Sequence, residues 1–390
     1  MKLRKIICLC ICLAIGGMIY FGYLICALAP STVHFHFKDN LGRPLPSNHT
    51  AMSYDYENDE ATGSNDQRFD INAHDVMVFL HIQKTGGTSF GRHLVSDLDL
   101  QRPCSCQRKK KRCYCFRPNR HEVWLFSRYS TGWKCGLHAD WTELTSCVHS
   151  ELDKNEGHVQ RRYFYISILR EPLSRYLSEF KHVQRGATWR NSRHWCGGRT
   201  ASPSELPKCY PGPYWRGVSL DEFADCPHNL ATNRQTRMMA DLSLVGCYNM
   251  SAMSTEQRNR MMLASAKRNL ASMAYFALTE YQKIDQYVFE ETFNMRFCVP
   301  FVQQNSTLSA TALAMLTPAQ LSKIQRLNAL DKELYEFARS LMMRRFDKLK
   351  AKDPKFEERW AKLGTLNEKT EFNWDQELDE ELTEQTKNTK

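Results

Sequence analysis

Residues 76–90, with the sequence VMVFLHIQKTGGTSF, contain the features that decide the fold. The segment 76–82 is an apolar run of strand length, Lys-Thr-Gly-Gly-Thr at 84–88 interrupts it, and a helical pattern begins at Ser89. Glycines let backbone N–H groups approach an anion closely, and the start of a helix adds partial positive charge. Lys84 adds a full charge on a flexible side chain. The stretch therefore predicts a buried strand, a phosphate-binding turn and a helix.

The turn differs from the phosphate-binding loop of nucleotide triphosphatases. That loop has the pattern G-x-x-x-x-G-K-[ST], in which the hydroxyl side chain ligates magnesium. Here the lysine precedes the two glycines, Gly86 and Gly87. An ordinary strand–turn–helix unit with a surface lysine would show the same short pattern, so this stretch alone leaves both interpretations open.

A second strand–helix unit is expected at residues 163–180, YFYISILREPLSRYLSEF. The apolar run ends at Leu169, and Pro172 suits the first turn of a helix. Arg170 then lies at the carboxyl end of the strand, where ligands bind in open parallel sheets. Ser178 follows two turns later, within reach of the same anion. The alternative is a plain strand–helix unit with an ion-paired arginine.

The remaining segments alternate between short strands and helices, as in an α/β fold with a central parallel sheet flanked by helices. We expect strands at 123–127 and 275–278, and helices that start near 220, 254 and 287. Polar residues at 232–238 are expected to line a cleft. A long amphipathic helix is predicted from Thr317 onwards. Its apolar stripe consists of Leu321, Ile324, Leu327, Leu330, Leu334, Phe337 and Leu341.

His138 is the candidate general base. It lies in the segment 130–141, STGWKCGLHADW, where it follows a glycine-flanked turn and has one tryptophan before it and one after it. The segment follows the strand expected at 123–127, and side chains at such positions project towards ligand clefts in α/β folds. A lone histidine is more often structural than catalytic, so the residue pattern by itself leaves both roles open.

The N-terminus predicts a membrane anchor, because an unbroken apolar run follows three basic residues. The run is longer than the core of a typical signal peptide, although a cleaved signal peptide is the alternative. The positive flank favours a cytoplasmic N-terminus and a lumenal bulk. The expected organisation is a cytoplasmic tail at 1–5, a transmembrane helix at 6–29, a lumenal stem at 30–72, a catalytic domain at 73–350 and a polar, acidic tail at 351–390.

Sequons and cysteines agree with a secretory-pathway location. Glycosylation is expected at Asn48, Asn249 and Asn305. Eleven cysteines lie outside the anchor, which in an oxidising lumen predicts disulfides with one cysteine left over. The four cysteines within 104–115 could instead form a zinc site, but their spacing is unusual and the loop between them is cationic. We expect disulfides there, and no metal.

Two basic segments, 101–120 and 181–217, predict an acidic partner. The first is rich in lysine and arginine, has no acidic residue and carries four cysteines, which argue against disorder. The second combines basic residues with tryptophans, whose faces can stack on sugar rings. A polyanion such as a sulfated glycan fits a lumenal protein, whereas nucleic acid does not. Solvated surface charge is the alternative.

Three segments together are similar to the heparan-sulfate 6-O-sulfotransferases: 79–89, 130–141 and 169–180. Their occurrence in the right order is far more specific than any one of them, and the similarity extends over about residues 75–345. The resemblance implies the sulfotransferase fold, which is P-loop NTPase-like. It also implies the donor 3′-phosphoadenylyl sulfate (PAPS), the 6-hydroxyl of glucosamine in heparan sulfate as acceptor, and a single-pass type II protein of the Golgi membrane.

The resemblance also assigns roles to residues. His138 matches the catalytic base, and Lys84 would stabilise the leaving phosphate. Arg170 and Ser178 match the site for the 3′-phosphate. The residues for the 5′-phosphosulfate are His81, Ile82, Gln83, Lys84, Thr85, Gly86, Gly87, Thr88 and Ser89. The acceptor contacts are Lys111, Arg112, Arg128, Trp133, His138, His182 and Trp189.

A further donor-binding loop of the family would include Val302, Gln303, Gln304, Leu308 and Ser309. The family commonly has arginine where this chain has Leu308, so one donor contact differs. Two other functions remain as alternatives at this point. A carbohydrate kinase that uses ATP would need the missing G-K-[ST] pattern, and a membrane-tethered heparin-binding protein would leave the glycine turn and Arg170 without a role.

Overall fold

The computed structural model describes residues 68–107, 112–189, 191–302 and 307–364, with the backbone alone for 307–310. The expected anchor and most of the expected stem lie outside these ranges, as do the residues after 364. Within the described ranges, no helix combines the length and the apolar character that a membrane span requires.

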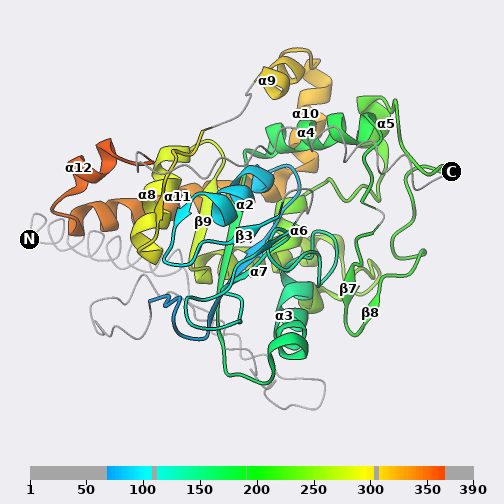
Figure 1. Ribbon diagram of the computed structural model, residues 1–390. Helices are drawn as coiled ribbons and strands as arrows, with labels where there is room; N and C mark the ends of the chain where they lie inside the picture. The colour runs from blue at the N-terminus through cyan, green and yellow to red at the C-terminus, as the bar shows by residue number, and fades with distance from the viewer. Residues whose placement is uncertain (1–67, 108–111, 190, 303–306, 365–390) are drawn as a thin grey trace, which may run out of the picture. The chain divides into compact units, whose positions relative to one another are not determined.

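A four-stranded parallel sheet forms the centre of the fold (Figure 1). Its order is β5 (Leu125–Phe126), β1 (Asp75–Leu80), β6 (Arg162–Leu169) and β9 (Tyr275–Leu278). The longest register pairs β1 with β6 over six residues. The predicted central parallel sheet is confirmed, and the apolar stretches that begin at 76 and 163 are its two inner strands.

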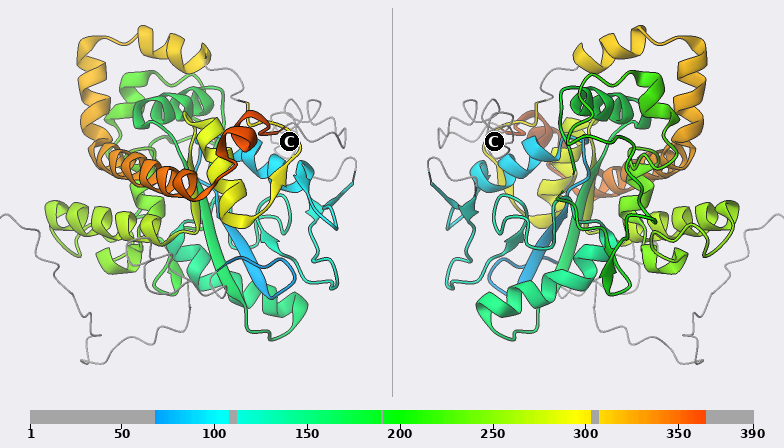
Figure 2. Two further views of the ribbon diagram at one scale, coloured as in Figure 1. Left: turned by 90° about the vertical axis from the view of Figure 1, so that its left-hand side faces the viewer. Right: turned by 90° about the vertical axis from the view of Figure 1, so that its right-hand side faces the viewer.

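Side chains of β1 alternate between two cores because successive residues of a strand point to opposite faces. Val76, Val78 and Leu80 enter one core. Helices α3 (Trp141–Glu156), α7 (Thr255–Ser272) and α11 (Ala329–Lys352) cover this core. Met77 and Phe79 enter the other core, under helices α2 (Gly87–Ser96) and α8 (Gln282–Phe293). Helices thus lie on both faces of the sheet, as Figure 2 shows. This burial on both faces explains why β1 has no polar–apolar alternation in the sequence.

Helices make up most of the remaining structure. Their bounds are α2 Gly87–Ser96, α3 Trp141–Glu156, α4 Pro172–Gln184, α5 Leu220–Asp225, α6 Arg234–Met239, α7 Thr255–Ser272, α8 Gln282–Phe293, α9 Thr307–Ala314, α10 Pro318–Leu327, α11 Ala329–Lys352 and α12 Phe356–Ala361, with a 3₁₀ turn at Leu242–Val245. The helix expected near 254 is confirmed: Ser254 caps α7 by accepting a hydrogen bond from the backbone of Gln257.

Three short antiparallel pairs lie outside the central sheet. They join β2 (Leu98–Asp99) to β10 (Arg296–Phe297), β3 (Ser105–Cys106) to β4 (Cys113–Tyr114), and β7 (Trp195–Cys196) to β8 (Arg199–Thr200). The last two pairs lie in the basic segments that the sequence singled out, and disulfides hold both of them.

The prediction of one long helix after Thr317 is wrong, because Asn328 divides it into α10 and α11. At Asn328 the backbone leaves the helical region, with φ −114° and ψ 29°. Its side-chain amide donates to the carbonyl of Ile324 and accepts from the backbone of Asn233. Asn233 in turn accepts from the first backbone amides of α11. A tertiary contact therefore ends one helix and caps the next, which the apolar stripe could not reveal.

Five disulfides confirm the prediction that most of these cysteines are disulfide-bonded. They pair Cys104 with Cys115, Cys106 with Cys113, Cys135 with Cys147, Cys196 with Cys247 and Cys209 with Cys226. Cys298 is the remaining cysteine outside the expected anchor. The four cysteines in 104–115 are thus disulfide-bonded, which overturns the zinc alternative.

The fold continues beyond residue 350, where we expected the acidic tail to begin. Helix α11 extends to Lys352, and α12 follows. Phe356 of α12 is buried, and its ring packs edge-on against Tyr287 of α8 at 5.2 Å. At least this part of the expected tail is therefore packed on the domain.

Candidate active site

The glycine turn joins β1 to α2 and has the backbone geometry of an anion site. Gly86 precedes the helix in a left-handed conformation, with φ 86°, and no side chain caps the helix start. The first backbone N–H groups of a helix lack intrahelical partners, so this N-terminus can donate hydrogen bonds to an anion. Lys84 also has a positive φ of 66°. The turn therefore has the backbone conformation that the predicted phosphate-binding role requires.

A side chain at position 87 would not fit. A Cβ added to Gly87 would lie 2.4 Å from Cδ2 of His81. The ring of His81 is buried and stacks on Phe79 at 5.3 Å. The histidine therefore packs beneath the turn, and its burial lowers its pKa well below the ordinary value. The ring is neutral and supports the turn, so it adds no charge for an anion.

Lys84 and Arg170 lie side by side, although 86 residues separate them in sequence. The Arg170 guanidinium donates to the Lys84 carbonyl oxygen at 3.3 Å. Burial lowers the pKa of Lys84 to about 8, and Arg185 and Arg170 act in the same direction. A negatively charged ligand would relieve this repulsion. The two predicted phosphate sites thus border one region, as a single donor requires.

Two residues to which the sequence analysis gave no role in donor binding hold this arrangement together. The Thr279 hydroxyl, just after β9, lies within hydrogen-bonding distance of the carbonyls of Thr85 and Leu169, at 2.6 and 3.0 Å. Gln235 of α6 bonds both the backbone N–H and the carbonyl of Arg170. These contacts connect the ends of β1, β6 and β9. Thr279 belongs to no recognisable motif, and Gln235 lies in the polar segment 232–238, whose bonds to Arg170 no sequence signal marked.

Ser178 lies on α4, the helix that follows Arg170. Glu171 caps this helix by accepting hydrogen bonds from the backbone of Leu173 and Ser174. Ser178 is half-buried in the second turn. The structure thus reproduces the predicted strand–helix unit, with Arg170 where β6 ends.

His138 contacts His81, the residue that follows β1 and precedes the glycine turn. Its Nδ1 is 2.9 Å from the carbonyl oxygen of His81, which can only accept a hydrogen bond. The proton of the neutral ring is therefore on Nδ1, which leaves Nε2 as a lone-pair acceptor. Residue 138 has a positive φ of 51°, a conformation that costs about 1–2 kcal/mol outside glycine. Strain of this kind clusters at functional sites.

Three aromatic side chains surround the His138 ring. Its centroid is 4.7 Å from those of Trp133 and His81, and 5.2 Å from that of Trp189. Burial among these rings lowers the pKa of His138 to about 3, although the bond to the His81 carbonyl opposes the shift. The imidazole is consequently neutral at physiological pH, as a general base must be before it accepts a proton.

Three other predicted acceptor residues, Arg112, Arg128 and His182, lie near Trp133 or Trp189. The guanidinium of Arg128 lies 5.5 Å from the ring centroid of Trp133, and the ring of His182 lies 5.4 Å from that of Trp189. Arg112 is exposed, and its side chain reaches the glycine turn at 132, just before Trp133. Five of the predicted residues are therefore brought together: Arg112, Arg128, Trp133, His182 and Trp189.

A buried carboxylate, Glu179, supports Trp189 from behind. The indole Nε1 donates to its Oε1 at 3.0 Å. Arg175 and Arg234 also donate to this carboxylate. Burial opposes ionisation, but the two guanidiniums lower the pKa of Glu179 to about 2. Arg234 belongs to the polar segment that we expected to line the cleft. Most of that segment is buried in α6 instead, where it supports the site.

Comparison with known proteins agrees with this geometry. The profile of the Sulfotransferase family matches residues 67–338. Heparan-sulfate 6-O-sulfotransferase 1 of Homo sapiens is 53% identical over 306 residues, which cover 78% of this chain and 74% of the human protein. This chain belongs to the heparan-sulfate 6-O-sulfotransferase family.

Two further relatives have the same family name. Heparan-sulfate 6-O-sulfotransferase 2 of Gallus gallus is 56% identical over 288 residues, which cover 73% of this chain and 71% of the relative. The corresponding protein of Danio rerio is 57% identical over 283 residues, which cover 71% of this chain and 60% of the relative. Membership of this family excludes the kinase alternative, for which the glycine turn already lacked the G-K-[ST] pattern.

The donor of the sulfotransferase family, PAPS, fits the residues that are present. The uncapped α2 N-terminus suits a phosphosulfate, because its backbone N–H groups are free of a side-chain cap and can donate to an anion. Gly87 fits there because any larger residue would collide with His81. Arg170 borders the same region and is suited to a phosphate. No group of three or more metal-ligating side chains gathers in the part of the chain that the structure describes.

Several predicted residues lie outside the described ranges. These are Lys111, Gln303, Gln304, Asn48 and Asn305. Leu308 and Ser309 fall in α9, where the backbone alone is described, and Val302 is 63% exposed. Asn249 is exposed in a turn, where its side chain accepts from the backbone of Ser251. Their roles in donor binding, acceptor binding and glycosylation stay predictions.

Proposed function

We propose that this chain transfers a sulfuryl group from PAPS to the 6-hydroxyl of glucosamine in heparan sulfate. The observation that carries the proposal is the juxtaposition of three elements. Lys84 at the glycine turn touches Arg170, and the His138 imidazole is anchored to the carbonyl at the start of the same turn. A donor bound by Lys84 and Arg170 would place its sulfur near His138.

In this proposal His138 is the general base. PAPS supplies the sulfuryl group. As the 6-hydroxyl oxygen forms its bond to sulfur, the bond from sulfur to the donor's phosphate oxygen breaks, and Nε2 of His138 takes the hydroxyl proton. The carbonyl of His81 then stabilises the imidazolium through Nδ1–H. A positioned base of this kind contributes about 10²–10⁴-fold in rate.

Lys84 and the amides of the glycine turn stabilise the leaving phosphate. They are fixed by the fold before reaction, and preorganised donors of this kind are most effective where charge develops. The remaining residues of 81–89 shape the turn, and Arg170 with Ser178 binds the 3′-phosphate. Arg112, Arg128, Trp133, His182 and Trp189 contact the acceptor, together with Lys111.

We further propose that the chain is a single-pass type II protein of the Golgi membrane with a lumenal catalytic domain. The apolar run at 6–29 and its basic flank support this topology. The five disulfides support a lumenal location, because disulfides persist in oxidising compartments.

Incubation with labelled PAPS and N-sulfated, 6-desulfated heparan tests the proposal. Disaccharide analysis should find the label on the 6-oxygen of glucosamine. Calorimetry with adenosine 3′,5′-bisphosphate should show one binding site per chain. Label at another position would refute the acceptor assignment, and absence of nucleotide binding would support the remaining alternative, a heparin-binding protein without catalysis.

A further inference from the structure

A cavity of about 470 Å³ lies next to Trp189, and His138 is not part of its lining. This indole forms part of the cavity lining, and its ring also contacts His138. The cavity is thus separated from the candidate base by one side chain. Its volume lies in the range of sites that bind small organic ligands. Apart from Glu179 and Arg234, which support Trp189, the remaining lining has none of the roles assigned above.

Aromatic rings and a lysine line the outer part of this cavity. Trp215 and Tyr210 are stacked with their centroids 5.2 Å apart, and both are partly exposed. Lys208 is exposed beside them. Aromatic faces offer apolar area to the C–H face of a sugar ring, and an ammonium group offers three hydrogen-bond donors to a carboxylate or sulfate. This combination suits an acidic sugar.

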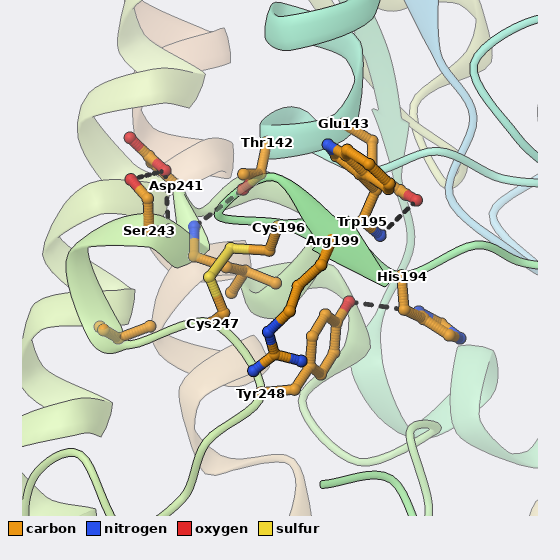
Figure 3. Close-up of a disulfide and its surroundings, with 12 residues drawn as sticks. Thr142, Glu143, His194, Trp195, Cys196, Arg199, Asp241, Ser243, Cys247 and Tyr248 are labelled. Carbon is orange, nitrogen blue, oxygen red and sulfur yellow. Dashed lines mark hydrogen bonds between the residues drawn. A yellow bond between two sulfur atoms is a disulfide. The ribbon is translucent and has the colours of Figure 1, made fainter. Parts of the chain in front are cut away.

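His194 also lines the cavity, and Figure 3 shows its ring bonded to Tyr248. Its Nδ1 is 3.2 Å from the Tyr248 hydroxyl, which itself donates to Asp140. Nδ1 is therefore the donor in this pair. Burial lowers the pKa of His194 to about 3, so the ring is neutral and Nε2 is an acceptor. A neutral acceptor is suited to a sugar hydroxyl.

Two disulfides hold the cavity walls in place. The bond between Cys196 and Cys247 fixes the chain two residues after His194 (Figure 3). The bond between Cys209 and Cys226 joins the segment that contains Lys208 and Tyr210 to the opposite rim. Side chains that are ordered in advance lose less entropy when a ligand binds. The walls therefore have the rigidity of a binding site.

The charge of the lining favours an anion over a cation. Among the described lining residues, Glu179 is the one carboxylate, and Arg175 and Arg234 already neutralise it. The charge of Lys208 is therefore not opposed by a second acidic group of the lining.

We propose that this cavity binds a neighbouring saccharide unit of the same acceptor chain, with its carboxylate or sulfate at Lys208. The proposal rests on the proposed function, because it places the glucosamine at His138 and the adjoining sugar beyond Trp189. Trp215 and Tyr210 pack against the ring of this sugar, and His194 accepts from a hydroxyl. The cavity thereby selects longer chains over short ones.

Acceptor length tests the proposal directly. We would measure KM and kcat for an N-sulfoglucosamine monosaccharide, which has no neighbouring unit, and for an N-sulfated octasaccharide, with the wild type, Lys208→Ala and Trp215→Ala. Lys154→Ala is the matched control, because it removes an exposed lysine of α3 that does not line the cavity. Trp215 also contacts Phe223, so a thermal melt of each variant reports on folding. Lys208→Ala removes an exposed side chain and leaves the packing intact.

In the wild type, we expect a lower KM for the octasaccharide than for the monosaccharide. Lys208→Ala should raise the octasaccharide KM about 5-fold and leave the monosaccharide KM, kcat and PAPS binding unchanged. Trp215→Ala should act in the same direction, and the control should match the wild type. An unchanged length preference in a folded Lys208→Ala variant would overturn the cavity assignment. Absence of transfer by the wild type would instead overturn the proposed function.

Discussion

The two halves of the candidate site are built in different ways. The donor half consists of two short turns at the ends of β1 and β6, each within about ten residues of sequence. The acceptor half combines side chains from the segment 128–138, from α4 and from the loop after α4, and disulfides hold its loops. The donor half depends mainly on backbone geometry, whereas the acceptor half depends on packed side chains from distant segments.

This difference has a physical reason. A phosphate is bound by N–H groups and positive charge, which one strand–turn–helix unit supplies by itself. A glycan presents hydroxyls and apolar faces over a longer distance, so its site needs several aromatic and polar side chains in fixed relative positions. Substitutions in the two halves should consequently affect different kinetic constants, and the following predictions test that separation, from the largest effect to the smallest.

His138→Ala tests the residue at which both halves meet. The variant loses the proposed base, so transfer should fall by about 10²–10⁴-fold. Binding of adenosine 3′,5′-bisphosphate should persist, because Lys84, the amides of the glycine turn and Arg170 are all retained. Calorimetry and a transfer assay measure the two effects. His158→Ala, at an exposed histidine, is the control. Full activity of His138→Ala would remove the base assignment.

Lys84→Ala should damage the donor half. Removal of a preorganised charge from the developing phosphate should lower kcat by about 10²-fold and weaken nucleotide binding as well. The KM for the glycan should change little, since the aromatic wall is untouched. Lys362→Ala, at an exposed lysine paired with Glu358, serves as the control. Unchanged donor affinity in Lys84→Ala would show that the turn does not bind the donor.

The pH dependence of donor binding should report on the same lysine. With a pKa of about 8, Lys84 is mostly protonated at pH 7 and about one tenth protonated at pH 9. Donor affinity should therefore fall by up to about 10-fold over this interval. Lys84→Arg keeps its charge and should flatten the profile. A wild-type profile that stays level from pH 7 to 9 would contradict the shifted pKa.

Trp189→Phe should damage the acceptor half alone. It retains an aromatic ring against His138 but loses the hydrogen bond to Glu179. A lost bond of about 1 kcal/mol predicts a glycan KM about 5-fold higher, with donor binding unchanged. Steady-state kinetics with each substrate varied in turn separates the two constants. A rise in the KM for PAPS instead of the glycan KM would mean that a change in the acceptor half also affects donor binding.

The fold and much of the candidate site could be predicted from local patterns. The apolar stretches at 76–82 and 163–169 are the inner strands, since a strand buried on both faces needs a continuous apolar run. The supporting roles of Thr279, Gln235 and Glu179 could not be predicted. Thr279 and Gln235 act through hydrogen bonds to segments that are 194 and 65 residues away, and Glu179 acts within a buried ion network.

Sequence by itself therefore determined the parallel sheet, the anion-binding turn, the disulfide-forming chemistry and the identity of the candidate base. The tertiary structure alone decided the disulfide pairs, the break at Asn328, the tautomer of His138 and the cavity beyond Trp189. The physical reason is the range of the forces. Backbone geometry and side-chain burial patterns repeat over a few residues, whereas hydrogen bonds between distant segments exist only once the chain has folded.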